Sequence, residues 1–274
     1  MLPACAQAPA RADPPERPVI EGRSHAAGGR LSRHRPLVGS LTTTGQPYTD
    51  AVPRSEFQRD LDEVEALIQD EARLCRSSLT TVIDALLRRD DEQARSVIAS
   101  DRGIDSIHIR IESAIESLLA RQSPVAVDLR LVISMIHVNL HLERIGDQCV
   151  NIAKLSLLMG PASLHAELAL DLQIMASQAD EMIQVAMRAF GARDLPSAES
   201  LVEMDQVINK TNYGLARNIV TSVGDAEVGL FVIVIGRCLE RVGDNAVDIG
   251  ERTAYLVSGE LREFTDASQD FALE

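Results

Sequence analysis

The feature that most constrains the fold is a ten-residue segment that occurs twice. "ERIGDQCVNI" spans Glu143–Ile152, and "ERVGDNAVDI" spans Glu240–Ile249, 97 residues further along. Around each copy, apolar residues recur at alternating spacings of three and four, which is the pattern of an α-helix that buries one face. These residues are Leu131, Met135, Val138, Leu142, Ile145, Cys149 and Ile152 in the first copy, and Val228, Val232, Ile235, Leu239, Val242, Ala246 and Ile249 in the second. The two halves of the chain therefore each contain a long helix of the same design.

The rest of the chain repeats in the same way. Helical patterns are predicted over about 55–87, 92–120 and 128–159, and again over about 163–190, 197–222 and 226–257. Pro124, Pro161 and Pro196 lie at the predicted breaks, where proline is tolerated. The pattern predicts an all-α fold of two tandem three-helix bundles with six long helices, related by internal duplication: repeat 1 over 55–160 and repeat 2 over 161–274.

Residues 1–54 differ from the two repeats. They contain eight of the eleven prolines and several glycines, and they show little apolar periodicity. A segment of this composition cannot bury enough apolar surface to offset the entropy of ordering it. We expect a disordered N-terminal extension.

Composition limits the classes of function. The formal net charge of −14 argues against a protein that binds a nucleic-acid backbone, whereas it is compatible with binding metal cations. The four cysteines include no Cys-x-x-Cys pair, which indicates reduced thiols in the cytoplasm. The longest apolar run, residues 228–236, is too short to cross a bilayer, which needs about 20 residues.

The repeated segment places carboxylates on a second face of each long helix, outside the apolar one. In the first copy these are Glu143 and Asp147, followed by Asn151, and in the second they are Glu240, Asp244 and Asp248. The preceding helix carries matching polar residues at an offset of 104: Asp101, Asp105 and His108 in repeat 1, and Asp205, Asn209 and Asn212 in repeat 2. If the two helices are antiparallel neighbours, each repeat gathers four oxygen ligands between them.

Such a set of carboxylates would repel one another unless a cation neutralised them. The sequence therefore predicts two metal sites, Asp101, Asp105, Glu143 and Asp147 in repeat 1, and Asp205, Asn209, Glu240 and Asp244 in repeat 2, with His108, Asn151 and Asp248 as further candidates. Repeat 2 is the weaker site, because an amide replaces one acid. The alternative is a solvated acidic face that pairs with nearby arginines and lysines.

Each repeated segment also has a glycine inside the helix. Gly146 and Gly243 cost about 1 kcal/mol each relative to alanine. We expect them to allow the close approach of another backbone or of a bound ion, with tight helix packing alone as the alternative. His137 and His141 are expected on the helix surface rather than in a metal site.

No catalytic motif is found in the sequence. It has no phosphate-binding glycine loop, no nucleophile elbow and no His-Glu-x-x-His helix. We therefore expect a protein that is not an enzyme. The alternative is a carboxylate-bridged iron oxidase or ferroxidase, whose metal site would lie inside a four-helix core rather than outside the apolar face.

Two Glu-Arg-x-Gly-Asp segments, each on the third helix of a duplicated three-helix unit with acids upstream, resemble the PhoU family over about residues 55–260. The resemblance implies a cytoplasmic, homodimeric regulator of phosphate-specific transport with multinuclear metal clusters on its surface. Iron is the first candidate metal, with zinc, magnesium or manganese as alternatives. The N-terminal extension and Asn209 depart from the family pattern.

The resemblance also implies partners and a direction of control. Members repress phosphate-starvation signalling when phosphate is plentiful, as adaptors between a phosphate ABC transporter and a membrane sensor histidine kinase. The expected partners are the transporter's ATPase subunit and that kinase, met at the inner face of the membrane without spanning it. No nucleic-acid partner is expected.

Overall fold

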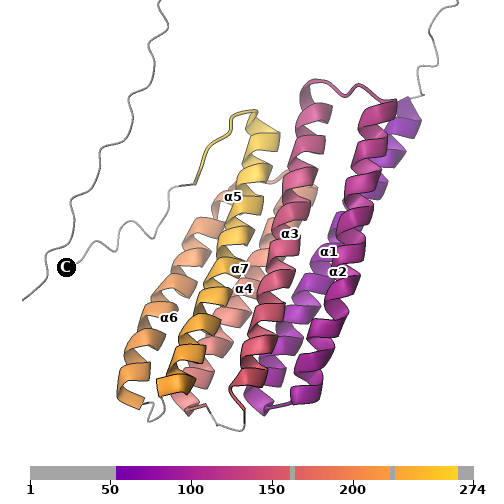
Figure 1. The fold of residues 1–274 in the computed structure, drawn as a ribbon. Helices are drawn as coiled ribbons and strands as arrows, with labels where there is room; N and C mark the ends of the chain where they lie inside the picture. Colours follow the sequence, from indigo (N-terminus) through magenta and orange to yellow (C-terminus); the bar gives the residue numbers. More distant parts are fainter. Residues whose placement is uncertain (1–53, 161–163, 223–225, 265–274) are drawn as a thin grey trace, which may run out of the picture. The chain divides into compact units, whose positions relative to one another are not determined.

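The computed structural model of the chain describes residues 54–160, 164–222 and 226–264, which all belong to one compact unit. Within these ranges the chain forms six long α-helices and one short helix, with no strand (Figure 1). The helices are α1 (Arg54–Arg88), α2 (Asp91–Arg121), α3 (Ala126–Leu158), α4 (Ala166–Ala192), α5 (Leu195–Glu199), α6 (Leu201–Ser222) and α7 (Ala226–Ser258). The all-α prediction is confirmed. The predicted disordered extension lies outside the described residues, apart from Arg54 at the start of α1.

The break after the first helix of each repeat is built in the same way. Arg89 has a left-handed backbone (φ 60°), and the side chain of Asp90 then accepts a hydrogen bond from the Gln93 N–H at 2.9 Å. In repeat 2, 104 residues later, Arg193 is again left-handed and Asp194 caps α5. A capping aspartate satisfies a backbone N–H that the helix start leaves unpaired. Both breaks therefore end one helix and begin the next within two residues.

The fifth predicted helix differs from the observed structure. A single helix was expected from Ser197, but the chain forms α5, a turn at Ser200, and then α6. The Ser200 hydroxyl donates to the Ser197 carbonyl at 2.8 Å, although Ser96 makes the equivalent bond without a break. The interruption coincides with a close approach to α7, where a Cβ built on Gly250 would lie 3.0 Å from a backbone carbonyl of α5. The break therefore accompanies packing against α7. The hydrogen bond of the Ser200 hydroxyl does not by itself explain it.

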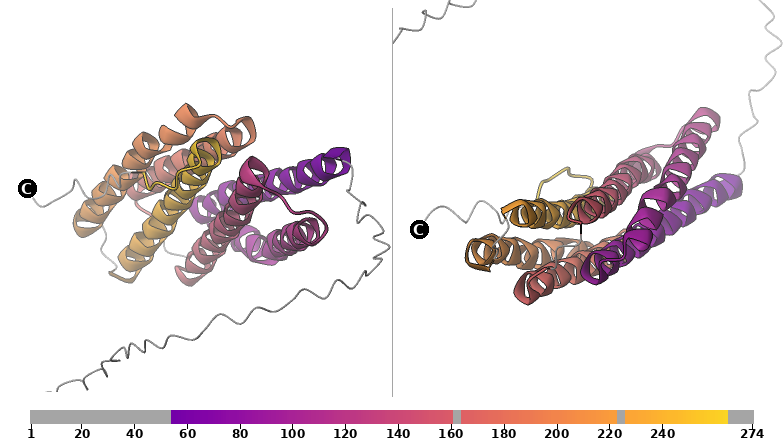
Figure 2. Two further views of the ribbon diagram at one scale, coloured as in Figure 1. Left: turned by 90° about the horizontal axis from the view of Figure 1, so that it is seen from above. Right: turned by 60° about the horizontal axis from the view of Figure 1, so that its bottom comes forward.

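The helices form two groups of three long members. Helices α1, α2 and α3 pack against one another, and α4, α6 and α7 do the same, with α5 against α4 and α7. The two groups join along α3 and α7, which lie side by side, and along α1 and α4 (Figure 2). All fourteen apolar residues predicted to face the core on the two repeated helices are buried. The predicted three-plus-three architecture is confirmed.

Helices α3 and α7 cross in opposite directions at the repeated segments. His141 Nδ1 lies 2.9 Å from the Asn245 Oδ1 and 3.3 Å from the Asp248 Oδ2, across this interface. The prediction that His141 lies on the surface is therefore wrong, since its side chain is buried. The error arises because α3 packs on two sides, against its own repeat and against α7, and the apolar pattern marks only the first.

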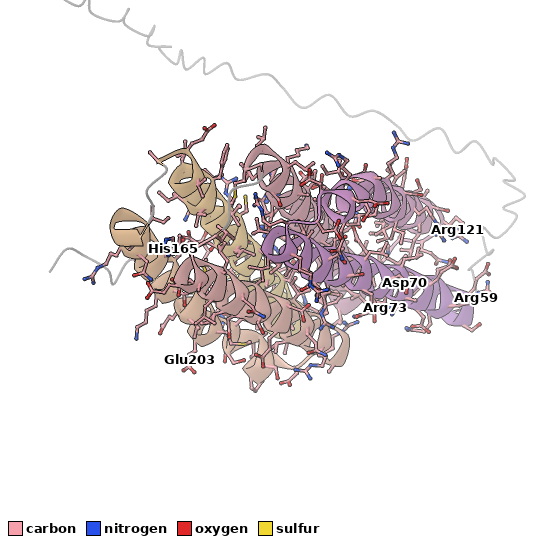
Figure 3. All side chains as sticks on the ribbon, turned by 90° about the horizontal axis from the view of Figure 1, so that it is seen from below. Arg59, Asp70, Arg73, Arg121, His165 and Glu203 are labelled. Atoms are coloured by element: carbon pink, nitrogen blue, oxygen red, sulfur yellow. The ribbon has the colours of Figure 1, made fainter. Side chains whose placement is uncertain are left out.

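Helices α1 and α4 join through charged side chains as well as apolar ones. Arg76 donates from Nε and Nη2 to the two carboxylate oxygens of Asp180, at 2.7 and 2.8 Å. Asp70 and Arg73, by contrast, pair on the outer surface of α1 (Figure 3). Within the described ranges, no helix is both long and apolar enough to cross a membrane.

Candidate metal centre

Site 1 consists of Asp101 and Asp105 from α2 with Glu143 and Asp147 from α3. The pKa of Asp101 is raised because the side chain is partly desolvated and because Asp105 and Asp147 lie close by. The pKa of Glu143 is raised by partial burial and by Asp147. No salt bridge neutralises these four carboxylates within the described part of the chain. Two antiparallel helices therefore bring together the acids that the sequence predicted as neighbours.

The two predicted glycines lie where a side chain from the facing helix comes close. A Cβ built on Gly146 would lie 3.1 Å from Ile104 Cδ1 and 3.9 Å from Asp101 Oδ1. A Cβ on Gly243 would lie only 2.8 Å from Asp205 Oδ1. The absent Cβ thus makes room for a side chain of the neighbouring helix rather than for its backbone: mainly Ile104 at Gly146, and Asp205 at Gly243.

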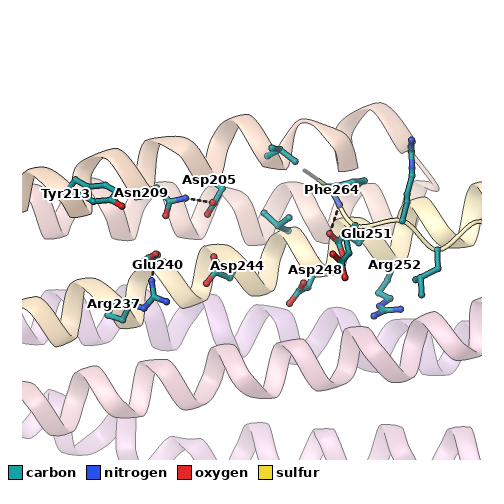
Figure 4. Close-up of a pocket in the computed structure, with 15 residues that line it drawn as sticks. Asp205, Asn209, Tyr213, Arg237, Glu240, Asp244, Asp248, Glu251, Arg252 and Phe264 are labelled. Atoms are coloured by element: carbon teal, nitrogen blue, oxygen red, sulfur yellow. Dashed lines mark hydrogen bonds and ion pairs between the residues drawn. The ribbon is translucent and has the colours of Figure 1, made fainter. Parts of the chain in front are cut away.

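Site 2 consists of Asp205 and Asn209 from α6 with Glu240 and Asp244 from α7 (Figure 4). Asn209 donates to the Asp205 Oδ2 at 2.7 Å, and Arg237 forms an ion pair with Glu240. Asn212, the counterpart of His108, donates to the second Glu240 oxygen at 2.8 Å. The chain's own amide and guanidinium donors therefore already occupy much of site 2.

Asp244 faces the same groove as the other site 2 residues. Its pKa is raised to about 7, because it is partly desolvated and lies near Asp205 and Glu240. The groove has a volume of about 680 Å³, and the C-terminal segment from Leu261 to Phe264 forms part of its wall. The Phe264 N–H donates to Glu251 there at 2.7 Å (Figure 4).

The three further candidates take different positions. His108 is largely buried on α2, with Nε2 3.6 Å from Glu112 Oε1. Asn151 is exposed on α3, one turn beyond Asp147. Asp248 lines the site 2 groove but is also paired with His141 of α3. Only His108 is positioned to extend site 1 inward.

The donor set of site 1 fits a cation better than that of site 2. In site 1, partial burial and repulsion from neighbouring carboxylates raise the pKa of Asp101 and of Glu143, which is the environment that a bound cation relieves. In the described ranges, however, no three histidine, cysteine or acidic side chains already converge on one point. A metal would therefore require the exposed side chains of Asp105 and Asp147 to rotate inward. In site 2, Arg237 already supplies a positive charge to Glu240.

One buried acid beside site 1 was missed in the sequence. Glu71 of α1 is fully buried, and its pKa is raised to about 9 by burial and by Glu143. The signal was present: Glu71 follows Ile68 by three residues and precedes Cys75 by four, so it lies on the apolar face of its helix. Its counterpart in repeat 2, at the offset of 104, is the buried Met175.

Comparison with known proteins places this architecture in one family. The PhoU domain family model matches residues 68–156 and 172–253, once in each repeat. The phosphate-specific transport system accessory protein PhoU homolog 1 of Thermotoga maritima is 31% identical over 218 residues, covering 78% of this chain and 94% of that protein. A PhoU homolog from Burkholderia sp is 28% identical, covering 75% and 90%.

Solved structures agree with the sequence comparison. The crystal structure of the phosphate transport system regulatory protein PhoU from Streptococcus pneumoniae matches with a TM-score of 0.70 and 30% identity, over 75% of this chain and 99% of that one. PhoU from Pseudomonas aeruginosa matches with a TM-score of 0.69 and 29% identity, over 74% and 100%. The chain, with its two copies of the three-helix unit, belongs to the PhoU family.

Proposed function

We propose that this protein is an accessory regulator of phosphate-specific transport. The observation that carries the proposal is the PhoU domain match in both repeats, since the relatives that span the same helices are phosphate-specific transport accessory proteins. The regulator restrains uptake and starvation signalling when phosphate is plentiful. It acts in the cytoplasm as an adaptor between the ATPase subunit of a phosphate ABC transporter and a membrane sensor histidine kinase, and it works as a homodimer.

Metal binding is the second part of the proposal. Site 1 holds the metal through Asp101, Asp105, Glu143 and Asp147, with iron as the first candidate. The support is that partial burial, together with repulsion from neighbouring acids, raises the pKa of Asp101 and of Glu143. Site 2 binds more weakly, because Arg237 and Asn212 already engage Glu240.

The regulatory role favours a protein that is not an enzyme. An oxidase of the carboxylate-bridged type holds its metals in the core of a four-helix bundle. Here Asp105, Asp147 and Asp244 are exposed on the outer side of the helices. The site is thus placed for contact with a partner or with solvent phosphate, rather than for enclosing a small substrate.

A deletion strain tests the regulatory role. Removing the gene from the source organism should raise phosphate uptake and alkaline phosphatase activity in phosphate-rich medium, and the wild-type gene should restore repression. Unchanged phosphatase activity in the deletion strain would contradict the proposal.

Complementation then tests the contribution of the metal. The pair Glu143→Gln with Asp147→Asn should lower the metal content of the purified protein and impair repression. Glu116→Gln is the matched control, because it neutralises an exposed acid of α2 away from both sites. Full repression by a metal-free double variant would separate the regulatory role from metal binding.

A further inference from the structure

Two buried polar groups face each other inside repeat 1 without a hydrogen bond. Neither carboxylate oxygen of Glu71 has a hydrogen-bond partner, and the buried Nδ1 of His108 has none either. The two groups lie 3.8 Å apart, across the interface of α1 and α2. Leaving a buried polar group without a hydrogen bond is unfavourable, and more so for a charged group. A ligand between them would remove that cost.

Repeat 2 shows that the fold does not need these groups. Helices α1 and α4 bury nearly the same positions at an offset of 104, from Val64 and Leu168 to Leu86 and Phe190. At this offset, Met175 replaces Glu71 and Asn212 replaces His108. Met175 is fully buried in an apolar setting, so a methionine fits this position of the three-helix unit. The acid and the imidazole therefore have a role beyond packing.

The surroundings of Glu71 point to a cation. Glu143 of site 1, on α3, interacts electrostatically with both Glu71 and His108, so a shift of its side chain would supply a third donor. Two ligand atoms about 2.1 Å from a tetrahedral ion lie about 3.4 Å apart, so the observed 3.8 Å needs only a small side-chain shift. Imidazole and carboxylate together suit iron, zinc and related ions, whereas magnesium prefers oxygen ligands alone.

We propose that Glu71, His108 and Glu143 form the inner end of the metal site in repeat 1, which takes a divalent first-row transition metal, and that site 2 lacks this inner end. The inference rests on the proposed metal binding of site 1, and it names two ligands and a class of metal. Asp101, Asp105 and Asp147 form the outer end of the same site. The two repeats therefore differ in which metals they hold, despite their shared origin.

The test replaces each of the two inner residues of repeat 1 with its counterpart from repeat 2. The full-length protein is stripped of metal, and Zn²⁺ affinity is measured by chelator competition for the wild type, Glu71→Met and His108→Asn. Each substitution should weaken Zn²⁺ binding at least tenfold, because it removes an inner ligand. Glu116→Gln, the exposed control on α2, should leave the affinity unchanged.

Two further measurements identify the ligands. Visible absorption of the Co²⁺-loaded protein should change in His108→Asn, because one nitrogen donor is lost, and in Glu71→Met. Glu71→Gln keeps the shape of the side chain but weakens its donor, so it should also reduce Zn²⁺ affinity if the methionine variant fails to fold. Mg²⁺ affinity should be the same in the wild type and in His108→Asn.

The outcomes separate this inference from the proposed function. If the wild type binds Zn²⁺ and Glu143→Gln weakens it, while Glu71→Gln and His108→Asn leave affinity and the Co²⁺ spectrum unchanged, the inner end is disproved and site 1 remains. If the wild type binds no transition metal at all, the proposed metal binding fails, and this inference fails with it. Repression of phosphate uptake in the complemented strain would still test the regulatory role.

Discussion

At the scale of single residues, the two repeats place different chemistry on the same framework. Glu71 and Met175 occupy equivalent buried positions, as do His108 and Asn212. Leu140 of α3 corresponds to Arg237 of α7, which forms the ion pair with Glu240. Repeat 1 thus has one acid more than repeat 2, and it lacks the arginine that pairs with the repeated glutamate. A few side chains on an otherwise shared framework therefore distinguish the two proposed sites.

Glu71 predicts how the metal-free protein responds to pH. Its pKa is about 9 in the fold, above the ordinary value of 4.5, because burial and Glu143 disfavour the charged form. Between about pH 4.5 and 9 the unfolded chain has released this proton while the folded protein keeps it. The contribution to stability therefore falls as pH rises, by at most about 1.4 kcal/mol per unit.

Glu71→Met removes this titration. In the presence of a chelator, the free energy of unfolding measured with urea should fall less steeply from pH 5 to pH 9 in the variant than in the wild type. At pH 8 the variant should be the more stable protein. Parallel pH profiles for the two proteins would show that Glu71 is not buried in its neutral form.

At the scale of helices, glycine sets how closely α6 and α7 pack. Gly236, Gly243 and Gly250 recur every seven residues along α7, and a Cβ on any of them would lie within 2.8 Å of a side-chain atom of the facing segments. Asp205 can lie over α7 only because Gly243 has no side chain. The spacing keeps the acids of α6 against those of α7. In repeat 2, the glycines that set the distance between α6 and α7 therefore also set the positions of the site 2 residues.

Gly243→Ala tests this coupling. The new methyl group would contact Asp205 Oδ1 at 2.8 Å and Ile208 Cδ1 at 3.0 Å, so overpacking should outweigh the gain in helix propensity. We expect a loss of about 1–2 kcal/mol in the free energy of unfolding. Gly214→Ala on α6 is the control, since its Cβ meets no atom within 4 Å, and it should stabilise by about 0.5–1 kcal/mol. Equal effects of the two substitutions in urea denaturation would argue against a close approach at Gly243.

At the scale of the whole described unit, the two three-helix groups share one hydrophobic core. The buried cluster includes residues from α1, α2, α3, α4, α6 and α7, and the α3–α7 and α1–α4 contacts join the groups. The bidentate pair of Arg76 and Asp180 adds a directional contact to the second interface. We therefore expect the repeats to unfold together rather than as independent domains.

A core substitution in repeat 1 tests this cooperativity. Ile111→Ala removes a fully buried side chain of α2 and should cost about 2–5 kcal/mol. Of the three tyrosines, Tyr213 and Tyr255 lie in repeat 2 and Tyr48 in the N-terminal extension, so in a Tyr48→Phe background tyrosine fluorescence reports repeat 2, whereas far-UV circular dichroism reports all helices. Both signals should show one midpoint, and Ile111→Ala should lower it equally in each. A fluorescence midpoint that does not move would show that the repeats unfold separately.

Much of this organisation is determined by the sequence alone. Apolar residues at spacings of three and four specify which face of each helix is buried, because burial of that face is what stabilises a helix in a bundle. The doubled Glu-Arg-x-Gly-Asp segment specifies the duplication, and it places Glu143 and Asp147 outside the apolar face. The six long helices, the break at Asp90 and the pairing of acids on α2 and α3 were all predictable on these grounds.

Only the tertiary structure decided the rest, because it depends on contacts between segments far apart in the chain. The antiparallel crossing of α3 and α7 buries His141, and no periodicity within α3 marks that second packed face. The turn at Ser200 accompanies the approach of α5 to α7. The sequence could not show that Glu71 lies near His108 and Glu143, because the three residues belong to three different helices. Local pattern determined the helices, and their packing determined which buried polar groups face one another.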